Sequence, residues 1–283
     1  MDRVRHRIGD KRVLGLVKAF LKAGILTEDG VERDTITGTP QGGILSPLLA
    51  NIALSVLDEY FTERQGDSNA RKRRRYHGLA NYRLIRYADD FVVMVHGTED
   101  DVNTLRSEVA AVLAPMGLRL SEEKTKTCHI DEGFDFLGFR IQRKRRRGSN
   151  QWFVYTWPSK KALASIKGKV RTLTQGGTNQ PLQALLVRLN QAQGGWANYF
   201  RHGVSKATFG YLDAFTWRRV YNWLCHKHPT LGRKKLVRHY YQQWRPRDGK
   251  VTLFNPATVA VTRYRYRGTQ IPSPWPTAEA PAT

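Results

Sequence analysis

The net positive charge is confined to one half of this chain, and this division constrains how the chain can fold. Residues 1–140 contain 21 lysines and arginines and 21 aspartates and glutamates, so their charges cancel. Residues 141–283 contain 26 lysines and arginines against three acidic residues and carry the whole net charge of +23. The change begins at the run Arg143–Arg147, and we expect a domain boundary there or just beyond it.

The basic half is also rich in aromatic residues, and this combination bears on the kind of partner. Sustained basicity with interleaved aromatics favours a polyanion. We expect nucleic acid and no membrane partner, because no segment combines a clean apolar face with a basic one and no apolar run approaches the roughly 18 residues of a membrane helix. The charged start of the chain also lacks the apolar core of a secretory signal.

The two cysteines, Cys128 and Cys225, lie far apart in the chain. Their separation argues against a disulfide scaffold and fits a reducing compartment, so we expect a cytoplasmic protein. Cys225 is followed by His226 and His228, which invites a zinc interpretation, but neighbouring residues cannot easily share one tetrahedral site. A packed cysteine beside surface histidines is the favoured interpretation.

Hydrophobic periodicity predicts a mixture of helices and strands in the first half. A helix starting near residue 46 would have Ser46 as its N-cap and Pro47 at its first position. Two apolar runs around Asp89 and Asp90 predict a β-hairpin with these acids at its turn. The full set of predictions is helices over 13–21, 46–60 and 99–114, a hairpin over 84–95, an exposed polar loop over 64–81, a strand and turn over 118–126, and a strand containing a glycine over 134–139.

Residues 159–241 show helical periodicity interrupted by helix-breaking residues. Breaks are predicted near Gly176, Gly194 and Pro229. The last part of the chain, about 30 residues rich in Pro, Arg and Tyr, is predicted to be an extended tail.

The adjacent acids Asp89 and Asp90 are candidate metal ligands. Neighbouring carboxylates repel each other, most of all in an apolar setting, and a hard cation such as Mg²⁺ would compensate for this repulsion. Carboxylates hold the ions of two-metal nucleotidyl transfer in this way. Taken alone, however, the pair is better explained as a polar turn, because Asp is common in turns.

The surrounding sequence changes that interpretation, because four blocks occur in the order found in reverse transcriptases. One block departs from the family pattern, which usually has Asn where this chain has Ser121. Thr39–Asn51 resembles the loop–helix block of group II intron reverse transcriptases, Arg86–Phe91 their catalytic hairpin, Leu118–Thr125 the block after it, and Phe136–Phe139 the primer-grip segment.

The resemblance implies a role for each block. Asp89 and Asp90 would be catalytic residues that bind Mg²⁺. Without the resemblance, the two adjacent glycines would indicate an ordinary loop. Lys124 would be interpreted as a solvated side chain, and Leu137–Gly138 as part of a strand with a bulge. With it, Gln41, Gly42, Gly43, Tyr87 and Lys124 would contact template or nucleotide, and Leu137 and Gly138 would contact the primer.

In the basic half, Leu185–Gly203 and Thr208–Trp223 resemble the maturase domain of the same family. The residues that can face a helical core are Leu212, Phe215, Val220 and Trp223. About one aromatic in four is expected to touch RNA. Candidate RNA-binding cations are Arg143, Lys144, Arg145, Arg146, Arg147, Arg218, Arg219, Lys234 and Lys235, with Lys227, Arg233 and Arg238 also able to face phosphates.

The resemblance implies an α+β fold, a partial right-hand polymerase palm with an antiparallel sheet and helices followed by an all-α thumb. The expected domains are a palm portion over 1–140, a basic linker or strand region over 141–156, a maturase or thumb domain over 157–250, and a basic tail rich in Pro and Tyr over 251–283.

The implied function is that of an RNA-directed DNA polymerase and maturase in a bacterial ribonucleoprotein. Its partners would be group II intron RNA, a DNA target or primer, and dNTPs if it is active. In the family, another metal-binding Asp precedes sequence like Arg3–Val13. We therefore expect this chain to be truncated so that it lacks the block with that first catalytic Asp. We expect no robust polymerase activity from the chain alone.

Three alternatives stay open at this point. The chain could be a non-catalytic RNA-binding splicing factor, or a decayed product without a stable fold. It could also act as a homodimer or together with an upstream reverse transcriptase fragment.

Overall fold

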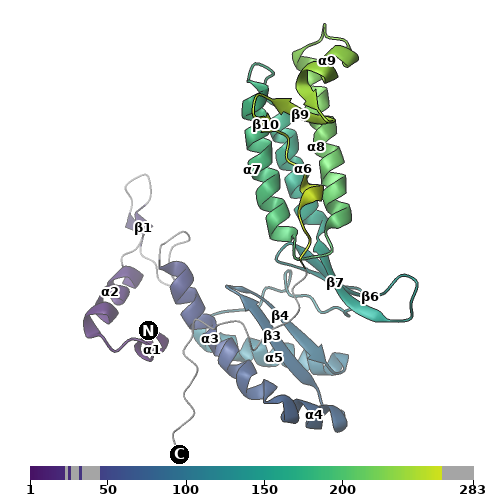
Figure 1. Ribbon diagram of the computed structural model, residues 1–283. Helices are drawn as coiled ribbons and strands as arrows, with labels where there is room; N and C mark the ends of the chain where they lie inside the picture. Colours follow the sequence, from purple (N-terminus) through teal and green to yellow (C-terminus); the bar gives the residue numbers. More distant parts are fainter. Residues whose placement is uncertain (23–24, 27–31, 34–44, 263–283) are drawn as a thin grey trace, which may run out of the picture. The chain divides into compact units, whose positions relative to one another are not determined.

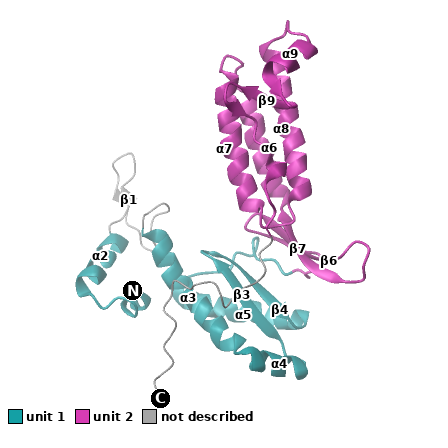
Figure 2. Cartoon of the chain, in the orientation of Figure 1, with its two compact units in different colours: residues 1–127 teal, residues 128–283 magenta. Residues whose placement is uncertain are grey.

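A computed structural model describes residues 1–22, 25–26, 32–33 and 45–262. The chain divides into two compact units, Met1–Thr127 and Cys128–Thr283 (Figure 2). Both units combine helices with antiparallel strands, which confirms a mixed α and β architecture. The assignment of these units to a polymerase palm and thumb stays a prediction. Within the described residues, no helix is both long and apolar enough to cross a membrane.

The first unit consists of helices around one long β-hairpin (Figure 1). Strands β3 and β4 pair antiparallel from Asn81 opposite His96 to Tyr87 opposite Asp90, which confirms the predicted hairpin. Its elements are α1 (Asp2–Arg5), α2 (Lys11–Lys22), β1 (Ile25–Leu26), β2 (Glu32–Arg33), α3 (Ser46–Gln65), α4 (Ser68–Tyr76), β3 (Asn81–Tyr87), β4 (Asp90–His96), α5 (Glu99–Leu113) and the 3₁₀ turn Ala114–Met116.

The hairpin is held by an apolar cluster that α3 and α5 build. Leu57 and Phe61 of α3 are buried against Leu105 and Val109 of α5, and alternate residues of both strands pack on them. Helix α5 begins with a capping box in which Thr98 and Asp101 satisfy each other's backbone amides. The predicted helices over 13–21, 46–60 and 99–114 are confirmed by α2, α3 and α5.

Three local predictions for this unit are wrong. The polar stretch 64–81 contains helix α4, because Asp67 accepts a hydrogen bond from the amide of Ala70 and caps it. Helix α3 has Leu45 as its N-cap, so Ser46 already lies in the first turn with Pro47. Residues 118–126 contain a turn and no strand, because Ser121 accepts hydrogen bonds from the amides of residues 124 and 125.

The second unit joins a three-stranded sheet to a helical bundle. The sheet has the order β5–β6–β7, and the predicted linker region 141–156 lies mostly in its strands β6 and β7. The elements are β5 (Phe134–Phe136), β6 (Phe139–Arg145), β7 (Trp152–Pro158), α6 (Lys160–Gln175), α7 (Leu182–Phe200), α8 (Lys206–Lys227), α9 (Arg233–Tyr240), β8 (Tyr241–Gln242), β9 (Arg245–Asp248), β10 (Val251–Thr252) and the 3₁₀ turn Pro256–Thr258.

The long helices α6, α7 and α8 lie side by side and bury apolar faces against one another (Figure 1). Their core contains Val170, Leu186, Leu189 and Val220, all fully buried. Leu253, beyond β10, also joins this core. Residues 251–262, predicted to begin an extended tail, therefore pack in part on the bundle.

The predicted helix breaks are partly confirmed. Helix α6 ends before Gly176 and α8 ends before Pro229, as expected. The break predicted at Gly194 is wrong, since α7 continues to Phe200. Each glycine costs about 1 kcal/mol in a helix interior, but the buried side chains of Leu189 and Phe200 on either side hold the helix together through packing.

Replacing Leu186 with alanine should destabilise the second unit by about 3 kcal/mol, because the side chain is fully buried among three helices. The neighbouring Val187, which is 38% exposed, is the matched control, and Val187→Ala should cost less than about 1 kcal/mol. Chemical denaturation followed by circular dichroism measures both. A noncooperative transition of the unchanged protein would contradict the packed core described above.

Candidate nucleic-acid site

The acidic pair lies at a two-residue turn between β3 and β4. Tyr87 pairs with Asp90, so Ala88 and Asp89 form the turn itself. Ala88 has a φ of 55°, in the left-handed region that costs a residue with a Cβ roughly 1 kcal/mol. Asp89, Asp90 and Tyr87 are exposed, and Tyr87 is 65% exposed at the end of its strand. The tight turn therefore presents both carboxylates to the surroundings.

The two carboxylates are available for a cation. The carboxylate groups of Asp89 and Asp90 have no hydrogen-bond or ion-pair partner among the residues that the structure describes. In the same residues, no group of three or more His, Cys, Asp or Glu side chains gathers at a metal-binding distance. The hairpin thus offers part of a ligand set, which suits Mg²⁺ because this ion commonly takes one or two carboxylates together with substrate phosphates and water.

Arg86 ties this turn to helix α3. Its guanidinium donates to Oδ2 of Asp58 at 2.5 and 3.1 Å, to Oδ1 of Asp58 at 3.3 Å, and to Oδ1 of Asn51 at 2.9 Å. It also donates to the carbonyl oxygen of Ala88 at 2.8 Å. The side chain is only 14% exposed, so these charge-assisted bonds are poorly screened. Sequence reasoning did not single out Arg86, because an arginine in a strand carries no signal of its partners.

The other predicted template and nucleotide contacts are not brought together within the described residues. Gln41, Gly42 and Gly43 lie outside those residues. Lys124 is exposed in the turn after Ser121, and in the described part of the chain no hydrogen bond or ion pair links it to the hairpin. Its predicted role stays a prediction.

The predicted primer-grip residues form a tight turn. Leu137 and Gly138 have φ values of 48° and 78° and connect β5 to β6, so the prediction of one strand with a glycine inside is wrong. The turn contacts the bundle through two hydrogen bonds. The hydroxyl of Tyr199 donates to the carbonyl oxygen of Leu137 at 2.9 Å, and the amide of Ser159 donates to the carbonyl oxygen of Gly138 at 2.8 Å. A Cβ at position 138 would lie 3.2 Å from the ring of Phe200.

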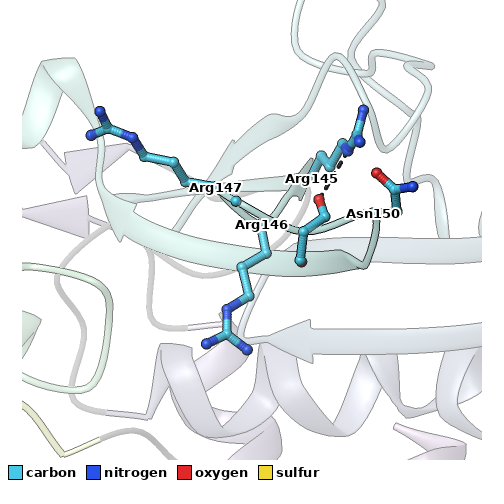
Figure 3. A pocket seen from close by; sticks show the side chains of 6 residues that line it. Arg145, Arg146, Arg147 and Asn150 are labelled. Carbon is cyan, nitrogen blue, oxygen red and sulfur yellow. Dashed lines mark hydrogen bonds between the residues drawn. The ribbon is translucent and has the colours of Figure 1, made fainter.

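The β6–β7 hairpin ends in a basic tip. An open hollow of about 410 Å³ is lined by residues 145–150, and Figure 3 shows Arg146 and Arg147 extending from it in different directions. Arg145 donates to the carbonyl oxygen of Ser149 at 2.9 Å. Arg146 and Arg147 are exposed and have no ion-pair partner among the described residues. The tip therefore has positive charge available for an external anion.

Two other cations of the predicted basic run are engaged within the fold. Arg143 donates to Asp131 at 2.6 and 2.8 Å, and these bonds lower the pKa of Asp131 below its usual range. Its guanidinium also lies 5.5 Å from the ring centre of the exposed Trp152. The ammonium of Lys144 lies 4.8 Å from the ring centre of Trp157. Cation–π contacts keep these charges beside the strands.

Some cations of the helical bundle are also engaged within the fold, whereas others are exposed. Arg219 donates to Oγ1 of Thr174 at 2.9 Å and links α8 to α6. Lys227 donates to the carbonyl oxygens of Thr178 and Gln180 and secures the loop before α7. By contrast, Arg218, Arg233, Lys234, Lys235 and Arg238 are exposed.

Most aromatic residues of the bundle are structural. Trp223 and Phe209 are buried, and Phe215 packs partly buried against the core, as predicted for Phe215 and Trp223. Cys225 also packs against the core, where its side chain interacts with that of Tyr221. Three aromatic side chains are largely exposed: Tyr199 at 52%, Tyr211 at 49% and Trp244 at 74%. Sequence reasoning did not single out Trp244.

Arg86→Lys should loosen the acidic turn, because a lysine cannot reproduce the fork that bonds Asp58, Asn51 and Ala88 together. Amide hydrogen exchange in β3 and β4 should become about tenfold faster, as expected from the loss of one or two charge-assisted bonds. Arg106→Lys, an exposed position on α5, is the control and should leave the exchange unchanged. Equal exchange in both variants would show that Arg86 does not hold the turn.

Two protein families match this chain in separate segments. Residues 2–141 match the reverse transcriptase (RNA-dependent DNA polymerase) family. Residues 163–241 match the group II intron, maturase-specific domain. The first segment contains the acidic hairpin and the Leu137–Gly138 turn, and the second contains most of the helical bundle. The basic tip lies between the two matches.

Three curated relatives are similar to this chain over a large part of its length. Protein YkfC of Escherichia coli is 40% identical over 195 residues, which cover 60% of this chain and 51% of that protein. The group II intron-encoded protein LtrA of Lactococcus lactis is 31% identical over 236 residues, which cover 66% of this chain and 37% of that protein. The 91 kDa protein in the cob intron of Schizosaccharomyces pombe is 30% identical over 182 residues, which cover 49% and 22%.

The chain spans about half the length of these relatives or less. Two adjacent family matches nevertheless account for the acidic hairpin and the basic bundle in one chain. The chain belongs to the group II intron reverse transcriptase/maturase family.

Proposed function

We propose that this chain binds group II intron RNA through the basic surface of its second unit and supports splicing and mobility of the intron. The observation that carries this proposal is that the bundle matched to the maturase-specific domain exposes cations without acidic partners. RNA folding brings phosphates close together, and cations held on a rigid surface lower the repulsion between them. The basic tip and the exposed cations of α8 and α9 would supply these contacts.

The charge of residues 141–283 favours an external polyanion. The acids from residue 141 onward are Asp213, Asp248 and Glu279. Asp213 accepts from Arg245 at 2.7 Å, and Asp248 accepts from the amide of Gln183 at 3.0 Å, so both already have partners. Three acidic side chains are too few to neutralise the 26 lysines and arginines of this segment, so phosphates outside the chain are the natural partners.

A second function, nucleotidyl transfer, is favoured by the free carboxylates at the β3–β4 turn. We propose that Asp89 and Asp90 hold Mg²⁺ together with nucleotide phosphates, in RNA-directed DNA synthesis from dNTPs on a primer. When bound, Mg²⁺ would neutralise the negative charge of the phosphates. Arg86 would position the turn, and the Leu137–Gly138 turn would contact the primer. RNA binding without synthesis is the alternative, since the described residues bring two carboxylates together at this turn and no third.

Replacing Lys234 and Lys235 with glutamine should weaken RNA binding at all salt concentrations and make it less sensitive to salt. Each lost phosphate contact should reduce the slope of log K against log salt by about 0.7 on a single strand. Fluorescence anisotropy with a labelled RNA measures both quantities. Lys11→Gln with Lys18→Gln removes the same charge from the first unit, and an equal loss there would argue against a specific role for α9.

Asp89→Asn should abolish any Mg²⁺-dependent primer extension on an RNA template while leaving RNA binding unchanged. The reason is that the amide removes a charged metal ligand and the site lies in the other unit from the basic bundle. Asp100→Asn on α5 is the charge-matched control and should retain full extension. RNA binding without extension by the unchanged protein would favour the non-catalytic splicing factor.

A further inference from the structure

The turn between β8 and β9 has an unusual composition for its backbone. Gln242 pairs with Arg245, so Gln243 and Trp244 form a two-residue turn. Their φ values are 48° and 64°, and neither residue is a glycine. Left-handed backbone costs each such residue roughly 1 kcal/mol, and asparagine followed by glycine is the usual choice. A tryptophan therefore lies where the backbone favours glycine.

A turn elsewhere in the same unit provides an internal comparison. Leu137 and Gly138 connect β5 to β6 with φ values of 48° and 78°, and glycine takes the second position. In that turn a Cβ at position 138 would press on Phe200. No such crowding fixes the choice at position 244, where the side chain is 74% exposed. The two turns thus share a backbone and differ in the side chain that they present.

Packing does not explain Trp244. Its carbonyl oxygen accepts from Nε1 of Trp217 at 2.7 Å, so α8 holds the backbone of the turn. The next residue, Arg245, donates to Asp213 and to the carbonyl oxygens of Leu253 and Phe254, which anchors the start of β9. Within the described residues, the indole ring of Trp244 makes no ring or cation–π contact. The neighbouring groups fix the backbone and leave the ring exposed.

The surroundings of the turn are aromatic and basic. Trp217 stacks on Tyr221 with ring centres 5.5 Å apart and planes 4° from parallel, and it also contacts Tyr241. Arg218, next to Trp217 on α8, is exposed. Helix α9, with its exposed cations, runs directly into β8. The turn is therefore joined to α9 through β8 and to α8 through Trp217, and both helices carry exposed cations.

We propose that Trp244 is a stacking platform for an unpaired base of RNA, presented by a rigid turn beside the cations of α8 and α9. This inference rests on the proposed RNA binding and names the part of the RNA that the turn contacts. An unpaired base is required because bases within an A-form helix are stacked on one another and their faces are covered. The indole face supplies the stacking surface, and its place in the exposed turn keeps the ring out of the core.

Trp244→Gly should separate stability from binding. Glycine adopts the left-handed region freely, so this variant should melt at or above the temperature of the unchanged protein. Its affinity for a single-stranded RNA oligonucleotide should fall about tenfold, as expected for the loss of one stacked base. Gln243→Gly is the matched control: it relieves the same strain, keeps the indole, and should bind RNA with unchanged affinity. Trp244→Phe should keep most of the affinity.

A strand of the same length without bases separates stacking from charge. The full chain with Trp244→Gly should bind this abasic strand as tightly as the unchanged protein does, whereas the Lys234 and Lys235 variant should bind it more weakly. Unchanged affinity of Trp244→Gly for RNA, an equal loss on the abasic strand, or a lower melting temperature would each overturn the stacking proposal. If the unchanged protein bound neither strand at low salt, the result would contradict the proposed RNA binding itself, and not only the role of Trp244.

Discussion

Burial of the apolar faces of α6, α7 and α8 is the interaction on which the basic half of this protein depends. Fully buried residues such as Leu189, Val220 and Leu224 supply its core. Each large side chain removed from water contributes about 1.5–3 kcal/mol, which offsets the mutual repulsion of many like charges around it. The helices can therefore carry exposed cations in excess. Without this core, the segment would resemble an extended polycation.

Two-residue turns with left-handed backbone recur at the parts of the chain to which function is assigned. Ala88 lies in the turn directly before Asp89, and Leu137 and Gly138 form the turn that contacts the bundle. Gln243 and Trp244 form the turn between β8 and β9. Each turn is held by a side chain from a neighbouring helix or strand: Arg86, Tyr199 and Trp217 all reach a turn carbonyl oxygen. Local strain is tolerated because these contacts fix the backbone.

The two chemistries proposed for this chain place different demands on it. Metal binding at the acidic turn needs oxygen ligands held close together, and Arg86 supplies rigidity there through Asp58 and Asn51. RNA binding needs charge spread over a surface. Part of that charge is not available to RNA, because Arg143 and Arg219 form hydrogen bonds within the fold. The exposed cations on α8, α9 and the β6–β7 tip are among those left for phosphates.

The sequence by itself determined the family, the separation of charge between the halves, the acidic hairpin and most helices, because these depend on short-range periodicity and on the order of motifs. Tertiary structure decided the remainder. Packing against α6 and α8 carried α7 through Gly194, and contacts with the bundle hold Leu137 and Gly138 in a tight turn. Which cations are free, and which aromatic is exposed in a strained turn, depends on partners distant in the chain. No local pattern contains that information.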